Sequence, residues 1–382
     1  MAEAAVEFMT GIRNSTGLTA AAAMVRAVDL FCGAGGLTKG LESVGIDVGL
    51  GIDVDPACEY PYTANNRAAF LLKDIKEVRA QDLDAAFGEA KYRLLAGCAP
   101  CQTFSTYNQK ARPDDARWWL LAQFSRLVRE VKPELVTMEN VPLLTTQGVF
   151  EQFLKTLNDL DYDPWLDIVN CSDYGVPQCR RRLVLMASRL GPIRLLDPSE
   201  LGCTVRTVRE SISKCPPLEA GCRDQNDELH QAARLSDTNL ARIRASRPGG
   251  TWRDWTDAPL AECHKRASGK TYPGVYARMS WDEPAPTITT QFYGFGNGRF
   301  GHPEQDRAIS LREGAILQGF PSDYAFVRPD ERVCKKPVGR LIGNAVPVDL
   351  GAAIGLSIAA HVHEIAGESR DRRFIPFVSM SY

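Results

Sequence analysis

The chain has 382 residues, of which 44% are hydrophobic and 24% charged, and this composition is typical of a globular protein with one large domain and a smaller one. Its net charge of −2 excludes a general attraction for polyanions, so a nucleic-acid partner would require positive charge concentrated on one surface. The 11 cysteines favour free thiols in a reducing cytoplasm, and since no apolar run reaches the roughly 20 residues of a membrane span, no membrane partner is expected.

Short apolar runs alternate with helical patterns in the first half of the chain. The predicted helices cover 37–44, 56–66 and 118–131. The predicted strands cover 26–31, 48–53, 92–96, 135–139, 164–170 and 183–187, and a further strand ends at Asp74-Ile75. Strands alternating with helices predict an α/β fold with a doubly wound, mainly parallel sheet. Ligands of such sheets bind beyond the carboxyl ends of the strands.

The pattern changes after residue 192. Pro- and Gly-rich breaks interrupt it, and only 237–245 has a clear helical pattern before residue 311. We therefore predict a first domain over 1–192, a smaller, loop-rich domain over 193–315, and a return to the first domain over 316–382. Within these parts the sequence predicts a helix over 311–318, a turn over 338–344 and a final helix over 350–363.

A Gly-rich turn, Phe31-Cys32-Gly33-Ala34-Gly35-Gly36, lies between the first predicted strand and helix. Glycines let the backbone approach a ligand at a helix N-terminus, where unpaired N–H groups favour an anion. Asp53 ends the second strand, where a carboxylate can accept ribose hydroxyls, and Asp74 could accept from an adenine amine. By itself the turn would equally suit a dinucleotide site or a structural role.

Three segments at predicted strand ends carry chemically distinctive side chains. The first runs from Gly97 to Ser105 around a Pro-Cys-Gln core, and the others are 138–142, containing Glu139, and 178–182, containing Arg180 and Arg182. Together they offer a nucleophile, an acid and an anion clamp. Taken singly, the C-x-x-C of residues 98–101 could be a redox pair or half of a zinc site, and the charged residues could be solvated.

In this order, the motifs resemble those of the cytosine-C5 DNA methyltransferases of bacterial and phage type. The likeness spans roughly 27–360 and includes Gly343-Asn344-Ala345-Val346-Pro347 as the final motif. It implies a Rossmann-like methyltransferase sheet, a target-recognition domain over 193–315, and double-stranded DNA as the substrate. It also implies S-adenosylmethionine as the methyl donor, with S-adenosylhomocysteine as the product, and it requires no metal.

The resemblance assigns catalytic roles to four residues. Cys101 would add to C6 of a cytosine flipped out of the duplex, and Glu139 would act at N3. Arg180 and Arg182 would clamp O2 and the flanking phosphate and favour the thiolate. The implied cofactor residues, with Asp55 as the alternative to Asp53 at the ribose, are Phe31, Gly33, Ala34, Gly35, Gly36, Asp53, Asp74, Ile75, Pro100, Asn344 and Val346.

Two rival functions stay open. A tRNA cytosine-C5 methyltransferase branch shares these motifs but carries a Cys-Phe-Thr signature, and this sequence contains no such tripeptide. A non-catalytic, DNA-binding regulatory homologue would be expected to have lost the nucleophile or its acid, and both Cys101 and Glu139 are present. We expect a cytoplasmic, nucleoid-associated monomer, working alone or with a cognate restriction endonuclease. Phe292, Tyr293 and Phe295 are expected to fill the core rather than to contact DNA.

Overall fold

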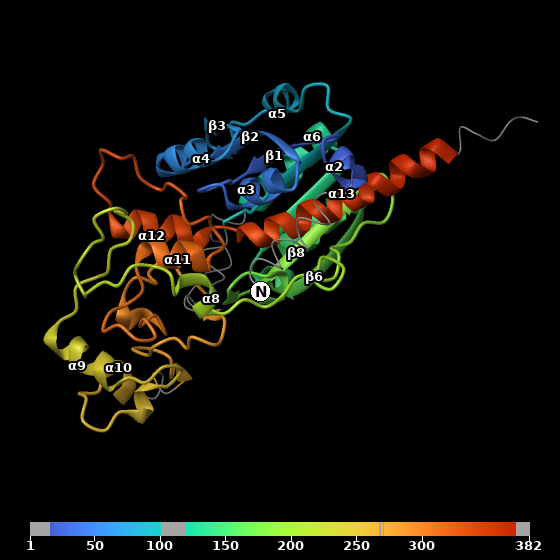
Figure 1. Cartoon of the computed structure of the whole chain (residues 1–382). Coiled ribbons are helices and arrows are strands. Elements are labelled where there is room, and N and C mark those ends of the chain that lie inside the picture. The colour runs from blue at the N-terminus through green and yellow to red at the C-terminus, as the bar shows by residue number, and fades with distance from the viewer. Residues whose placement is uncertain (1–15, 101–118, 267–268, 270, 372–382) are drawn as a thin grey trace, which may run out of the picture.

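The computed structural model describes residues 16–100, 119–266, 269 and 271–371 (Figure 1). The proposed nucleophile, Cys101, lies outside these ranges, whereas the other predicted site residues lie within them. The account that follows concerns the described part of the chain.

Seven strands form the central sheet, in the spatial order β3-β2-β1-β4-β5-β8-β6. The first five strands in this order are parallel to one another, and β8 runs antiparallel to both β5 and β6. This confirms the predicted mainly parallel α/β sheet. The strands are β1 (Val25–Leu30), β2 (Asp47–Asp53), β3 (Ala69–Leu72), β4 (Tyr92–Gly97), β5 (Leu135–Asn140), β6 (Asp163–Asn170) and β8 (Arg181–Ser188).

The strand order places the topological switch point between β1 and β4. The chain leaves β1 towards β2 on one side, and β4 continues towards β5 on the other. Connections that diverge in this way leave a crevice beyond the carboxyl ends of the two strands. The loop after β1 is the Gly-rich turn, and the loop after β4 leads through Cys98 to Pro100. Two of the predicted motifs therefore border the crevice.

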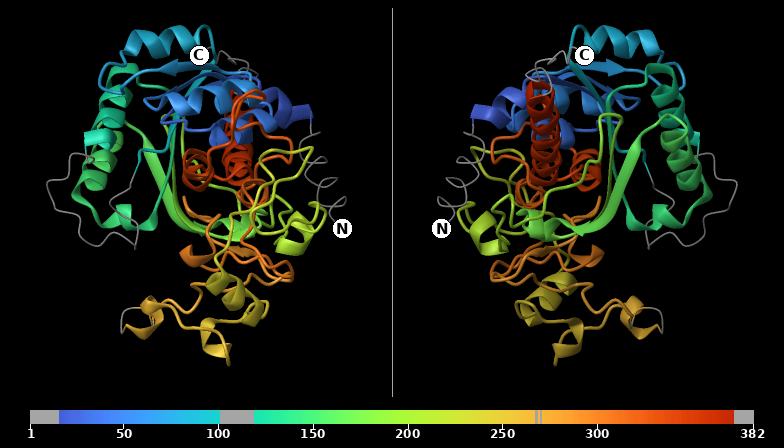
Figure 2. Two further views of the ribbon diagram at one scale, coloured as in Figure 1. Left: turned by 90° about the vertical axis from the view of Figure 1, so that its left-hand side faces the viewer. Right: turned by 90° about the vertical axis from the view of Figure 1, so that its right-hand side faces the viewer.

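Helices cover both faces of the sheet (Figure 2). Alternate strand residues point to opposite faces, so that Leu94 packs in one apolar core and Leu95 in the other. The first core is covered by α2 (Thr16–Ala22), α3 (Gly36–Ser43) and α13 (Val348–Asp371), and the second by α5 (Ala80–Phe87), α6 (Trp119–Val131) and α7 (Gly148–Asn158). Burial on both faces explains why the central strands β1, β4 and β5 are largely apolar.

The stretch Lys335–Gly367 is long and apolar enough to cross a membrane. However, 83% of its most apolar window is buried inside the protein. Leu350, Ile354 and Ile358 of α13 pack in the same apolar core as Leu37 and Leu41 of α3. The apolar surface of this stretch is thus used to cover the sheet.

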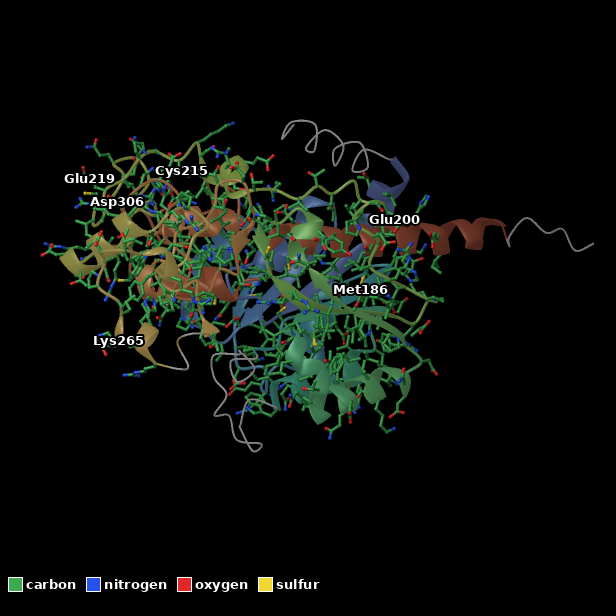
Figure 3. The ribbon with its side chains drawn as sticks, turned by 90° about the horizontal axis from the view of Figure 1, so that it is seen from below. Met186, Glu200, Cys215, Glu219, Lys265 and Asp306 are labelled. Atoms are coloured by element: carbon green, nitrogen blue, oxygen red, sulfur yellow. The ribbon has the colours of Figure 1, made fainter. Side chains whose placement is uncertain are left out.

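A smaller, loop-rich part lies beside the sheet and carries α9 (Asp237–Ala245) and α10 (Glu262–Lys265) (Figure 1). Figure 3 labels Lys265 and Asp306 in this part and Met186 in the sheet. Its two-residue strand β9 (Ala285–Pro286) pairs with β7 (Gln178–Cys179), which precedes β8. The helices here and at the junction are α8 (Val208–Ile212), α9 (Asp237–Ala245), α10 (Glu262–Lys265), α11 (Leu311–Leu317) and α12 (Lys335–Asn344), and α4 (Glu59–Asn65) lies beside the sheet.

A third apolar core joins the smaller part to α11 and α12. Phe292 is fully buried in it, and Phe295 is buried in a small satellite cluster, which confirms the prediction that these rings fill the core. Tyr293 is half-buried and packs against the third core. The boundaries predicted at residues 192 and 315 remain predictions.

Two local predictions were wrong. Residues 338–344 form the end of helix α12 instead of a turn, because Gly339 and Gly343 serve close packing and not chain reversal. A Cβ on Gly343 would lie 2.5 Å from the carbonyl of Thr289. The third strand ends at Leu72, so Asp74 and Ile75 lie in the loop that follows it.

Candidate active site

The carboxyl group of Glu139 is the centre of the site. Glu139 lies near the carboxyl end of β5 and is 6% exposed. Its Oε1 is 2.8 Å from Nε of Arg182. The antiparallel direction of β8 creates this contact, because the amino end of β8 meets the carboxyl end of β5 and Glu139 pairs with Val184. An acid and an arginine predicted from separate motifs are therefore neighbours.

A second side chain reaches the same carboxyl group. The Cys98 thiol lies 2.9 Å from Oε2 of Glu139 and 2.9 Å from the Glu139 carbonyl oxygen. Burial and the Glu139 charge raise the pKa of Cys98 well above its usual range. A group held as a neutral thiol is a poor nucleophile and a poor partner for disulfide exchange. Of the two cysteines in this C-x-x-C segment, Cys98 is thus unsuited to attack.

Asn140 fixes the backbone that leads to Cys101, the predicted nucleophile. Its side-chain amide donates to the carbonyl of Ala99 over 3.0 Å, while its Oδ1 accepts from the N–H of Val141. Pro100, a predicted cofactor residue, follows Ala99 and is exposed. The end of β5 therefore anchors the loop after β4 two residues before Cys101.

The two predicted arginines occupy different environments. Arg182 is half-buried against Glu139, and Arg181 between them is exposed. Arg180 is 3% exposed and donates to the carbonyls of Ile288 and Gly343, each over 3.0 Å. Burial and the nearby charge of Arg182 lower the pKa of Arg180 to about 9, which still leaves it charged at pH 7. Arg180 joins three segments of the chain.

Gln178 and Gln318 form a buried amide network that the sequence analysis missed. Nε2 of Gln178 donates to the Leu317 carbonyl and to Oε1 of Gln318, and its Oε1 accepts from the N–H of Ile288. Gln318 in turn donates to the carbonyl of Ala345. A glutamine before an arginine cluster is a weak sequence signal, since its partners lie more than 100 residues away.

Backbone conformation and close packing explain the glycines of the Gly-rich turn. Gly35 caps α3 with a left-handed φ of +89°, a conformation that favours glycine. A Cβ on Gly36 would lie 2.2 Å from the carbonyl oxygen of Val346, so only glycine fits there. Phe31 also has a left-handed φ of +59°, and Gly33 faces open space. Ala34 accepts a hydrogen bond from the Tyr324 hydroxyl through its carbonyl.

Asp53 braces this turn. Its Oδ2 accepts from the Gly33 N–H and its Oδ1 from the Asp55 N–H, both over 2.9 Å. Burial raises the pKa of Asp53. Asp55, the alternative ribose acceptor, is paired with Arg340 over 2.5 Å. Because the Asp55 carboxylate is already engaged in this ion pair with α12, Asp53 is the better candidate for accepting ribose hydroxyls.

The remaining predicted cofactor residues lie around the same edge. Asp74 is half-exposed, and Oδ1 accepts from the N–H of Lys76. Ile75 is buried, and its carbonyl accepts from Arg126 of α6 over 3.0 Å. Asn344 is exposed at the end of α12, and Val346 is buried against the turn. These residues come from two separate segments, the loop after β3 and the end of α12 with the residues just after it.

The sequence analysis did not identify two exposed apolar side chains at this edge of the sheet. Val54 is 65% exposed and directly follows Asp53, and Leu72 is 48% exposed at the end of β3. Asp53 and Leu72 are paired in the sheet, so these side chains lie at the same edge. An apolar residue between two acids, as in Asp53-Val54-Asp55, is the signal that could have found the first.

A buried acid lies beneath the turn. Asp29, near the end of β1, accepts a hydrogen bond from the Thr38 hydroxyl over 2.8 Å, and Thr38 also contacts the Tyr62 hydroxyl. Burial raises the pKa of Asp29 to about 7. The first turn of α3 is thus tied to β1 by a hydroxyl–carboxyl pair.

The profile of the family described as C-5 cytosine-specific DNA methylase matches residues 25–360, which include the sheet, the site and the smaller part. The chain belongs to this family. It is a DNA cytosine-5 methyltransferase, and the methylase has well-matched relatives. The Type II methylase M.HgiDII of Herpetosiphon aurantiacus is 49% identical over 356 residues, covering 92% of this chain and 100% of that protein. The Type II methyltransferase M1.HphI of Haemophilus parahaemolyticus is 30% identical, covering 87% and 86% of the two chains.

Solved structures share the fold of the methylase. A prophage-encoded Escherichia coli protein described as a DNA modification methyltransferase superposes with a TM-score of 0.69 at 21% identity, covering 89% of this chain and 99% of that one. The S. pombe Dnmt2 methyltransferase superposes with a TM-score of 0.60 at 19% identity, with the same coverage. At such identities the likeness establishes the Rossmann-like architecture alone.

Proposed function

We propose that the methylase transfers a methyl group from S-adenosylmethionine to C5 of a cytosine flipped out of double-stranded DNA, through a covalent bond between Cys101 and C6. The observation that carries this proposal is the Glu139 carboxyl group, which lies between Arg182 and the loop leading to Cys101. Since C5 lies inside the base stack of a duplex, an enzyme that modifies it must take the base out.

The proposed chemistry begins at Cys101. Cytosine C5 is a weak nucleophile, and addition of the Cys101 thiolate to C6 makes it enamine-like, so that it can form a bond to a methyl group. Loss of the C5 proton and cleavage of the bond between sulfur and C6 then restore the aromatic ring and the thiolate. The assignment of Cys101 rests on the motif order, and the neutral state of the Cys98 thiol supports it.

Glu139 and Arg182 would stabilise the base during this addition. Glu139 would hold N3 by a hydrogen bond or a proton, which draws charge out of the ring as sulfur adds. Arg182 places a cation beside that carboxyl group, where it can neutralise charge at O2. Arg180 donates to two backbone carbonyls, so we assign it to positioning these groups and not to direct contact with the base.

The residues at the edge of the sheet fit S-adenosylmethionine, which when bound supplies an electrophilic methyl group. The first N–H groups of α3 would hold the methionine carboxylate, and open space at Gly33 leaves the turn accessible. Asp53 would accept ribose hydroxyls, since each carboxylate oxygen keeps a lone pair after bonding one N–H. Phe31, Val54 and Ile75 would contact the adenine, with Asp74 at its amine, while Pro100, Asn344 and Val346 would close the site.

We infer a biological role from the relatives. M.HgiDII is named a Type II methylase, so a modification role beside a cognate restriction endonuclease is the favoured setting. The enzyme would act in the cytoplasm, on the nucleoid, as a monomer that methylates the two strands of a site in separate events. The smaller part would read the DNA sequence.

Methyl incorporation tests the proposed reaction. The purified enzyme would be incubated with labelled S-adenosylmethionine and unmethylated genomic DNA, with tRNA in a parallel reaction, followed by nucleoside analysis. Label in 5-methylcytosine of DNA alone is expected, and bisulfite sequencing of that product would give the target site. Label in tRNA alone would refute the DNA substrate. If the enzyme binds the cofactor but labels neither tRNA nor DNA from several unrelated genomes, the proposed catalysis would be refuted.

A further inference from the structure

The two oxygens of the Glu139 carboxyl group have chemically different neighbours. Oε1 lies against the Arg182 cation, and Oε2 lies 2.9 Å from Sγ of Cys98. A proton on Glu139 is disfavoured at the oxygen beside a cation, because the cation stabilises negative charge there. The protonated oxygen would therefore be Oε2, the one beside the thiol.

The thiol can serve this oxygen in both of its states. Sγ is also 2.9 Å from the Glu139 carbonyl oxygen, so its single proton has two acceptors at equal distance. While Oε2 is ionised, the S–H can donate to it. Once Oε2 carries a proton that is directed at N3, the S–H can turn to the carbonyl or still donate to a lone pair of Oε2, since a hydroxyl oxygen also accepts. No heavy atom needs to move in this exchange.

The thiol is also held in the form that this exchange requires. Cys98 is half-buried at the end of β4 and packs against the apolar core of the sheet. Burial and the neighbouring carboxylate keep it protonated at neutral pH. Packing alone would explain an apolar side chain at this position, but it does not explain two polar contacts to one residue.

We propose that Cys98 is a positioning residue that holds the Glu139 carboxyl group in its working orientation throughout the reaction. It would keep Oε2 directed at the base whether or not that oxygen carries the proton. This inference rests on the proposed function of Glu139 at N3. It separates the two cysteines of the C-x-x-C segment into a nucleophile, Cys101, and a support for the acid, Cys98.

Single-turnover methyl transfer at saturating DNA and S-adenosylmethionine would test the inference. Cys98→Ala should lower the rate about tenfold, which corresponds to about 1.4 kcal/mol, with Kd for cofactor and DNA within about threefold of wild type. Cys98→Ser should retain at least about a third of the rate, because a hydroxyl both donates and accepts. Cys203→Ala is the matched control, since Cys203 is a half-buried thiol packed on the same core, and it should keep the wild-type rate.

A double-mutant cycle would show whether Cys98 acts through Glu139. Glu139→Gln should be slow, and adding Cys98→Ala to it should cost less than about a further twofold. Equal losses for the Cys98→Ser and Cys98→Ala variants, or a full tenfold loss when Cys98→Ala is added to Glu139→Gln, would reduce Cys98 to a packing residue. Wild-type activity in Glu139→Gln would instead remove the proposed acid, and the inference with it. Melting temperatures within a few degrees would show that all variants are folded.

Discussion

Glu139 and Asp29 are both buried carboxyl groups at the catalytic edge, but their neighbours differ. Glu139 is paired with the Arg182 guanidinium. Asp29 receives a hydrogen bond from the neutral Thr38 hydroxyl, and burial raises its pKa to about 7. A buried carboxylate with a cationic partner costs the folded state little free energy, whereas a buried carboxylate without one destabilises the fold. This contrast predicts different consequences of removing each charge.

Asp29→Asn should stabilise the protein at neutral and alkaline pH. The folded pKa lies above the unfolded value of 3.8, so the folded state binds the extra proton, and the stability of the wild type falls as the pH rises from about 4 to 7. The amide does not titrate and can still accept from Thr38. Urea unfolding from pH 5 to 8 should show an advantage that grows with pH, up to about 4 kcal/mol. An advantage that does not change with pH would contradict this assignment.

Cys101→Ala should abolish methyl transfer while leaving S-adenosylmethionine binding near normal. In the proposed mechanism the Cys101 thiolate forms the bond to C6, and the methyl group of alanine cannot replace it. Calorimetric cofactor binding and methyl incorporation, measured on one preparation, would check both halves. Turnover comparable to wild type would remove Cys101 from the mechanism.

At the scale of elements, the contact between the N-terminus of α3 and the segment joining α12 to α13 shapes the cofactor edge. The Val346 carbonyl lies against Gly36, and Asp55, just after β2, is paired with Arg340 of α12. The final motif is thus held to the Gly-rich turn by close backbone packing and by an ion pair. Such a contact tolerates little added volume.

Gly36→Ala should therefore weaken cofactor binding. The added methyl group would push the Val346 carbonyl away, since its ideal position lies 2.2 Å from that oxygen. We expect the Kd for S-adenosylmethionine to rise at least about tenfold, or about 1.4 kcal/mol, by calorimetry. Gly148→Ala, at a glycine with open space around it, is the control and should bind normally. Equal affinities in the two variants would argue against the contact.

At the scale of the whole molecule, buried polar groups join the sheet to the smaller part. Arg180 bridges the carbonyls of Ile288 and Gly343, and Gln178 bonds Ile288 and Gln318. These bonds act together with the β7–β9 pairing. They fix the position of the smaller part relative to the end of β5, where Glu139 lies.

Arg180→Ala should consequently destabilise the fold. Two buried carbonyls would lose their charged donor, at a cost of about 2–4 kcal/mol in the free energy of unfolding. Arg181→Ala is the matched control, because Arg181 is the exposed neighbour and should change stability little. Urea titration of both variants would measure this difference. Stability equal to wild type in Arg180→Ala would contradict this structural role and would favour direct contact between Arg180 and the base.

Much of the sheet could be predicted because parallel strands buried on both faces are continuous apolar runs. Predictions of turns from glycines were less reliable. Gly339 and Gly343 indicated a turn, but in α12 they allow the helix to pack tightly against Thr289 and Thr290. Sequence alone cannot separate a glycine required by conformation from one required by contact.

The candidate site was predictable as a set of motifs but not as a geometry. The motif order indicated Glu139 and Arg182, and their contact follows from the antiparallel direction of β8, which no local pattern encodes. The position of Arg180 depends on Ile288 and Gly343, which are more than 100 residues away in the chain. The contact between Cys98 and Glu139 could not be predicted, because the two residues lie 41 positions apart in the chain.

The alternation along residues 180–182 also constrains how this enzyme family can evolve. Arg180 and Arg182 face inward and Arg181 faces solvent. Inserting or deleting one residue here would exchange inside for outside, exposing the Arg180 and Arg182 guanidinium groups and burying that of Arg181. Relatives can therefore differ by substitutions in this segment. An insertion or deletion should be tolerated only if it involves two residues, or if the turn ending at Gly175, which has a left-handed backbone, takes up the change in length.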